Sequence, residues 1–178
     1  GMHFMLFSLW RRRPRILWMA AICVLVAFDQ VSKAYFASTI TLGHAIQVTD
    51  WFNLVHAVNK GAAFSLFADA GGWQRPFLIG VSLLVILPVT VVCMFRQVDP
   101  VERGVGGLVV AGGMGNLIDR IQTGGVVDFL DLHWRSLHWP AFNMADVYVV
   151  SALLLWIALS LKGTVFTSPS ELKAKVKS

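Results

Sequence analysis

Residues 76–95 read PFLIGVSLLVILPVTVVCMF, twenty residues without one charged side chain. A helix of about 20 mostly apolar residues is long enough to cross the hydrocarbon core of a bilayer. The whole chain shares this character: 56% of its 178 residues are hydrophobic, only 14% are charged, and the mean hydropathy is +0.66. Soluble domains usually contain about 25% charged residues. The sequence therefore predicts a membrane protein, and its length suits one compact helical bundle.

Three further segments are candidate membrane spans: 16–36, 104–121 and 145–161. The first follows the basic stretch RRRPR, so a cleaved signal peptide is one interpretation. We favour an uncleaved anchor, because the apolar run continues through Asp29 and Lys33 and no A-x-A cleavage site closes it. The segment 104–121 is rich in glycine, and such small residues let helices approach closely in lipid. We predict a membrane α-helical fold with four transmembrane helices.

The distribution of Lys and Arg predicts the orientation of this bundle. With four spans both termini share one side, and that side carries ten of these residues against five on the other. Because basic residues concentrate in cytoplasmic segments, we expect a basic cytoplasmic N-terminus (1–15), a membrane domain (16–161) and a polar cytoplasmic tail (162–178). The loops 37–75 and 122–144 then face outward.

The outer loops have features of a membrane-surface layer. The stretch AIQVTDWFNLVHAVN (45–59) contains short alternating runs, which favour a small β element. Four tryptophans lie in the two loops, and tryptophan is enriched at the headgroup layer: Trp51, Trp73, Trp134 and Trp139. We therefore expect both loops to lie on the bilayer.

Several function classes are disfavoured by composition. The net charge is +5, but the basic residues gather at the chain ends and in one short loop, which is a poor pattern for nucleic-acid binding. Cys23 and Cys93 both fall in apolar runs and are predicted to be buried free thiols. No C-x-x-C or Cys/His cluster exists, so we expect no metal and no cofactor.

The unusual polar residues converge on the outer ends of the predicted spans. Ionisable residues near hydrocarbon are costly and are functional candidates by default. Polar or ionisable residues lie at the end of the first span, at the end of the third and at the start of the fourth. One more carboxylate follows the third span in the outer loop. In this order they are Asp29, Lys33, Asn116, Asp119, Arg120, Asn143 and Asp146, with Asp128 in the loop.

Each of these residues also has a structural interpretation. Asp29 and Lys33 can form an i,i+4 ion pair, and Arg120 can extend to the lipid headgroups. Asn143 and Asp146 have the spacing of a helix N-cap and its N3 partner. The other polar residues of this loop suit a wet surface and need no function: Asp131, His133 and His138.

These separate interpretations do not explain why Asp128 and Asp146, from different elements, should meet at one depth. Two close carboxylates share a proton. One can then activate water as a base while the other protonates the substrate. The sequence has no H-E-x-x-H zinc motif and no G-x-S-x-G serine motif. Acyl hydrolysis by an aspartate pair is the chemistry that fits, although the sequence leaves open which aspartate is protonated.

At these residues the chain resembles the lipoprotein signal peptidase family, also called signal peptidase II. The matching stretches follow the family's order and spacing from the first to the fourth span: DQVSK (29–33), NKGAAFS (59–65), GGMGNLIDR (112–120), GGVVDF (124–129) and FNMAD (142–146). The resemblance implies a bacterial inner-membrane aspartyl endopeptidase with four transmembrane helices and a periplasmic β-cradle. It implies prolipoprotein substrates that are diacylglyceryl-modified on a cysteine, with cleavage just before that cysteine.

The resemblance also implies residue roles. The catalytic pair falls on Asp128 and Asp146. The positions that hold substrate or orient the pair fall on Asn59, Asn116, Arg120 and Asn143, and the supporting positions fall on Asp29 and Lys33, to which we add Gly61 and Asp119. Membrane lipid and peptide-like inhibitors such as globomycin are the other expected partners. We expect the GAAF stretch that starts at Gly61 to let loop 37–75 turn tightly and close over the substrate, with Trp51 or Phe64 pressing on it.

Two alternatives remain open at this stage. In a small transporter or ion-binding protein, Asp29, Lys33, Asp119 and Arg120 would line an ion path. Such a path needs polar residues near the midplane, whereas here they gather at one end. In a structural subunit, the same residues would only pair helices, and removing their charge would change stability and no chemistry.

Overall fold

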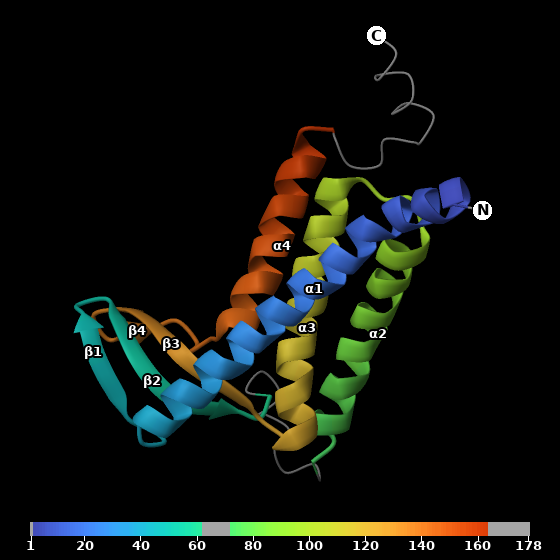
Figure 1. Cartoon of the computed structure of the whole chain (residues 1–178). Coiled ribbons are helices and arrows are strands. Elements are labelled where there is room, and N and C mark those ends of the chain that lie inside the picture. Colours follow the sequence, from blue (N-terminus) through green and yellow to red (C-terminus); the bar gives the residue numbers. More distant parts are fainter. Residues whose placement is uncertain (1, 62–71, 164–178) are drawn as a thin grey trace.

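The part of the chain that the structure describes folds into four long helices and a small sheet (Figure 1). The computed structural model describes residues 2–61 and 72–163, with side chains from residue 14 onward. Phe64, the remainder of the GAAF stretch and the tail from residue 164 lie outside the described residues. In chain order the elements are α1 (Met2–Thr39), β1 (Ala45–Thr49), β2 (Phe52–Asn59), α2 (Gln74–Phe95), α3 (Pro100–Gln122), β3 (Val126–Trp134), β4 (Leu137–His138) and α4 (Met144–Leu161).

The four predicted spans all lie within helices. Three described helical segments are long and apolar enough to cross a membrane: Pro14–Thr39, Gln74–Phe95 and Met144–Leu161. Helix α3 is not among them, because its glycines and charged residues lower its mean hydropathy. It contacts α1, α2 and α4, and nine of its residues are buried. The N-terminal stretch predicted as a separate segment is part of α1, which begins at Met2.

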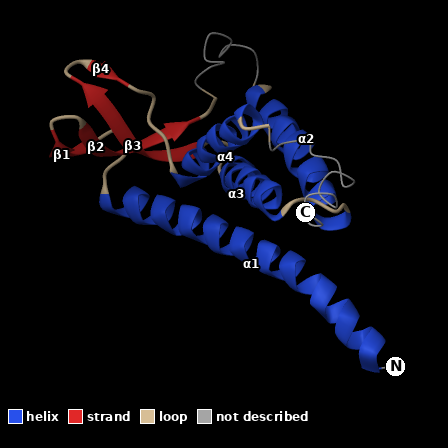
Figure 2. Cartoon of the chain, turned by 90° about the horizontal axis from the view of Figure 1, so that it is seen from above, coloured by secondary structure: helices blue, strands red, loops and turns tan. Residues whose placement is uncertain are grey.

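Small residues on α3 make this central position possible. A Cβ atom added at Gly112 would lie 2.5 Å from the backbone oxygen of Ala145, and one added at Gly115 would lie 2.5 Å from Asp29 Oδ2. The predicted close packing of this glycine-rich helix is therefore confirmed. The thiol prediction is half right: Cys93 is buried, but Cys23 is exposed, because α1 lies along one side of the bundle and packs with only part of its surface (Figure 2).

The sheet is antiparallel with the order β1-β2-β3-β4, and it lies at one end of the bundle (Figure 1). The β element predicted in 45–59 is confirmed as β1 and β2. Within the predicted outer loop 122–144, the structure forms β3, which pairs Ala57 with Asp128. Two buried positions of this strand hold carboxylates, Asp128 and Asp131, which obscured its pattern in the sequence. The stacked rings of Phe36 and Phe129 attach β3 to α1.

Candidate active site

The connection from α3 to α4 brings the site together. It leaves α3, runs along β3 past Asp128, and returns to the start of α4. Leu130 N donates to Phe142 O (2.9 Å) and Phe142 N donates back to Leu130 O (3.0 Å). This bridge holds the residue before Asn143 against β3, so the first turn of α4 begins beside Asp128.

Asn143 joins the two aspartates. Its Nδ2 donates to Asp128 Oδ1 (2.8 Å), and its backbone N donates to Asp146 Oδ2 (3.1 Å). Its Oδ1 accepts from Asp146 N (3.0 Å), which completes the predicted capping box of α4. Asn143 is fully buried, at 0% exposure. One residue is therefore both the helix cap and the link between the carboxylates.

Asn116 supports the same arrangement from α3. Its Nδ2 donates to Asp146 Oδ1 (2.9 Å). Its Oδ1 accepts from Asn143 Nδ2 (3.1 Å) and from Lys33 Nζ (3.2 Å). Since two donors hold the oxygen side of the amide, the nitrogen side is directed at Asp146, so both oxygens of that carboxylate accept a hydrogen bond.

A buried ion network lies behind these residues. Lys33 Nζ lies 2.7 Å from Asp29 Oδ2 and 3.3 Å from Asp119 Oδ2, so the predicted i,i+4 pair is confirmed and extended. Asp29 Oδ1 accepts from Ala145 N (2.8 Å), one of the backbone donors left free at a helix start. Gln30, another polar residue at the outer end of the first predicted span, donates from Nε2 to Asp119 Oδ1 (2.9 Å). The network ties α1 to both α3 and α4.

The remaining predicted residues lie around the pair. The positive charge of Arg120 lies near enough to Asp128 and Asp146 to interact with both. Asn59 hydrogen-bonds to Asp128 through its side chain. Its Oδ1 also accepts from Gly61 N (2.8 Å), and Gly61 has φ +104°, a backbone conformation that favours glycine.

The environment shifts the proton affinity of Asp128. Burial raises its pKa, and the nearby charge of Asp146 raises it further. Hydrogen bonds from Asn143 and Asn59 and the charge of Lys33 oppose the change, and the pKa settles at about 7. A carboxyl with that pKa exchanges a proton near neutrality, as a group in acid–base catalysis must.

Asp131 lies three residues further along β3, and its pKa is shifted in the opposite direction. We predicted a wet loop position, and this is wrong, because only 7% of the residue is exposed. Burial alone would raise its pKa, but hydrogen bonds from His138 and Asn53 outweigh burial and lower it. Asn53 Nδ2 donates to Asp131 Oδ2 (2.8 Å), and no feature of the sequence indicated this cross-strand contact. The polar environment of Asp131 makes it a structural carboxylate.

Fold and site together define a helical membrane protein in which a buried aspartate, Asp128, and a partly buried one, Asp146, are linked by Asn143. Within the described ranges, no group of three or more His, Cys, Asp or Glu side chains has the arrangement of a metal site. The polar network lies where α1, α3, β3 and α4 meet, at the end of the bundle that carries the sheet (Figure 1).

Comparison with known proteins identifies the family. Residues 21–162 match the family model described as signal peptidase (SPase) II. A lipoprotein signal peptidase of Serratia marcescens is 45% identical, covering 79% of this chain and 82% of that protein. One from Cupriavidus necator is 44% identical, with 79% and 81% covered. The chain belongs to the signal peptidase II family. It is a bacterial membrane protein and a hydrolase of the aspartic peptidase type, so the transporter alternative is discarded.

Solved structures agree with this assignment. Two structures of a bacterial membrane enzyme superpose on this chain with TM-scores of 0.73 and 0.72, each at 28% sequence identity. The first covers 82% of this chain and 93% of its own, and the second covers 86% and 92%. The arrangement of helices and sheet is therefore shared by known membrane enzymes.

Proposed function

We propose that this protein removes the signal segment of diacylglyceryl-modified prolipoproteins by cutting just before the lipidated cysteine. The observation that carries the proposal is the link through Asn143, which hydrogen-bonds to Asp128 and to Asp146 at once. The raised pKa of Asp128, about 7, leaves a proton on one carboxyl of the linked pair near neutral pH. Water-dependent cleavage of a peptide bond needs such a base and such an acid.

The mechanism assigns separate roles to the two aspartates. Asp128, with its raised pKa, carries the proton at rest. Asp146 accepts a proton from water as the water oxygen attacks the carbonyl carbon before the modified cysteine. Asp128 protonates the carbonyl oxygen, and as the tetrahedral intermediate collapses the pair delivers a proton to the leaving nitrogen. Asn116 and Asn143 hold the two carboxyl groups in position through their hydrogen bonds, and Arg120 binds a carbonyl oxygen of the peptide.

The orientation of the protein in the membrane follows from the same proposal. The start of α1 and the end of α4 lie opposite the sheet (Figure 1), and we assign that end to the cytoplasm because basic residues concentrate there. All four helices then span the bilayer, with the sheet as a cradle on the periplasmic side. The lipid of the substrate holds its cysteine at the outer leaflet, level with Asp128. We also propose that globomycin-type peptides bind at the pair.

The decisive experiment is cleavage of a diacylglyceryl-modified prolipoprotein in detergent micelles, followed by gel shift. Wild type is compared with Asp128→Asn and Asp146→Asn, and Asp131→Asn is the matched control because it removes a buried carboxylate from the same strand. We expect wild type and Asp131→Asn to cut, and the other two to be folded but inactive. Near-normal cleavage by Asp128→Asn or Asp146→Asn would contradict the shared-proton mechanism.

A second measurement tests closure of the outer loop. We propose that the segment containing Trp51 and Gly61 closes over bound substrate. Hydrogen–deuterium exchange should then be slower in this segment when an inhibitor is bound, whereas equal exchange with and without inhibitor would contradict the proposal.

A further inference from the structure

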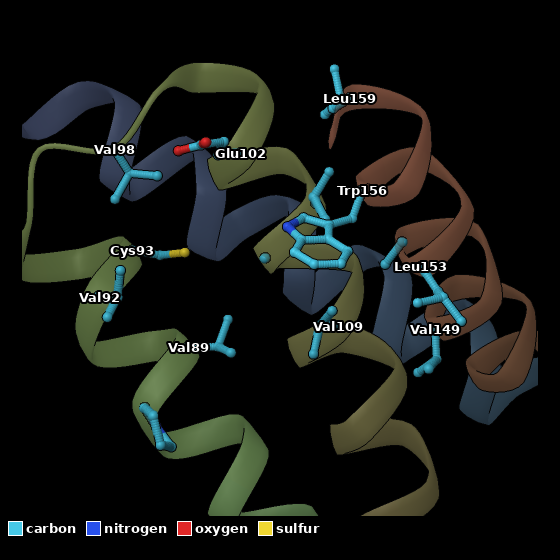
Figure 3. A pocket seen from close by; sticks show the side chains of 14 residues that line it. Val89, Val92, Cys93, Val98, Glu102, Val109, Val149, Leu153, Trp156 and Leu159 are labelled. Carbon is cyan, nitrogen blue, oxygen red and sulfur yellow. The ribbon is translucent and has the colours of Figure 1, made fainter. Parts of the chain in front are cut away.

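An apolar groove runs between α2 and α4, with α3 as its floor (Figure 3). Its volume is about 660 Å³. The walls and floor are formed by aliphatic, sulfur-containing and aromatic side chains, among them Val92, Cys93, Val109, Leu153 and Trp156. Glu102 is the one charged side chain among the described residues that line the groove.

The groove continues the candidate active site along the same helix faces. Positions seven residues apart lie on one face of a helix, two turns from each other. On α4, Leu153 lies in the groove seven residues after Asp146. On α3, Val109 lies in the groove seven residues before Asn116. Val149, also a lining residue, packs against Gly112 just below the pair. A segment lying in the groove therefore points at the two aspartates.

We propose that this groove binds the apolar core of the substrate's signal segment as a helix, with the basic start of that segment beside Glu102. The inference rests on the proposed function. Signal segments have a basic start followed by an apolar core of about 7–15 residues, which as a helix measures roughly 10–22 Å. Glu102 precedes Asn116 by fourteen residues on α3, or about 21 Å along the helix.

The charge pattern at the inner end of the groove supports this occupant. An apolar groove in a membrane also accommodates lipid tails, but a carboxylate at its inner end favours a cationic partner. Asp99 lies nearby but accepts the hydrogen bond that caps α3, from Val101 N at 2.8 Å, and it does not line the groove. Arg96 and Arg103 do not line the groove, although the positive charge of Arg103 lies close enough to interact with the lining residue Cys93. Glu102 is therefore the charged group in the lining itself that a basic segment in the groove would contact.

Photo-crosslinking tests the occupant directly. In full-length protein carrying Asp128→Asn, a photoreactive residue is placed at Leu153, which lines the groove, or at the adjacent Leu154, which does not and is 62% exposed. With diacylglyceryl-modified prolipoprotein bound, we expect crosslinks from position 153 to the apolar core of the signal segment and a yield at least several times lower from 154. Equal yields, or crosslinks from 153 to phospholipid alone, would overturn the proposal.

A charge exchange tests the role of Glu102. We expect Glu102→Lys to raise KM roughly two- to fivefold for a substrate with a basic start, and to lower KM for one whose basic residues are replaced by Glu. Asp99→Asn removes the same charge from this end of α3 but keeps a capping oxygen. It should leave the ratio of the two substrates' KM values unchanged. If Glu102→Lys changed KM equally for both substrates, Glu102 would have only a local role in the first turn of α3. That result would overturn its proposed contact with the basic start of the signal segment.

The two proposals can fail separately. If wild type does not cleave the lipidated prolipoprotein, the proposed function fails and the groove loses its occupant. If wild type cleaves but position 153 does not crosslink to the signal segment, only the groove proposal fails.

Discussion

The raised pKa of Asp128 predicts that replacing this carboxyl with an amide stabilises the protein at alkaline pH. The pKa rises from the ordinary 3.8 to about 7 in the folded protein. One pH unit of difference is about 1.4 kcal/mol, so ionised Asp128 opposes folding by up to about 4 kcal/mol above pH 7. Below pH 3.8 the carboxyl is neutral in both states, and the opposition is absent.

Asp128→Asn should therefore unfold at a higher temperature than wild type at pH 8, and at nearly the same temperature at pH 4. The asparagine remains neutral throughout, and its oxygen can still accept from Asn143 Nδ2. The assay is thermal unfolding of the full chain in detergent, with the difference between variant and wild type measured at several pH values. That difference should grow as pH rises from about 4 to about 7, the interval between the two pKa values.

Asp131→Asn is the control, because it should change the free energy of unfolding in the opposite direction. The lowered pKa of Asp131 means that its carboxylate stabilises the fold above its unfolded pKa, and that this contribution is lost as pH falls through the folded value. The variant should be less stable than wild type at pH 7, and the deficit should shrink in acid. If Asp128→Asn gives the same shift at pH 4 and pH 8, or if both variants respond alike to pH, the electrostatic reasoning is refuted.

Three other predictions concern stability and assembly. Lys33→Met leaves Asp29 without its buried counter-ion and should destabilise the fold by about 3–5 kcal/mol, seen as loss of monodisperse protein on size exclusion. Asn143→Ala removes the helix cap, worth about 0.5–2 kcal/mol, and should also abolish cleavage, whereas retained cleavage would separate the cap from the chemistry. Gly115→Ala introduces a methyl 2.5 Å from Asp29 Oδ2 and should destabilise by about 1–3 kcal/mol. Gly80→Ala meets nothing within 4 Å, and an equal loss in thermal stability there would contradict the packing argument.

The helices could be predicted from the sequence because their signals are local. A run such as 76–95 carries its own reason to be a helix in lipid, and the Asn143–Asp146 spacing marks the start of α4. The strand β3 could not be predicted in the same way. Its buried positions Asp128 and Asp131 are satisfied by partners from α4 and β2, and such distant partners leave no periodic pattern in the strand itself.

The residues of the candidate site could be predicted from the sequence, but the contacts between them could not. Depth along each predicted span brought the polar residues to one end, and the family motifs singled out Asp128 and Asp146. The sequence did not show that Asn143 contacts both aspartates, because that contact depends on the backbone bridge between Leu130 and Phe142. Nor did it show the acceptor role of Asp29 toward Ala145 N, which joins residues 116 positions apart.

That last contact bears on when the protein becomes active during its synthesis. Asp29 lies in the first helix to enter the membrane, and Ala145 opens the last. Asp128 has no partner aspartate until the final helix has docked. On the proposed mechanism, a chain whose last helix has not docked holds no water-activating pair, and hydrolytic activity requires the whole bundle.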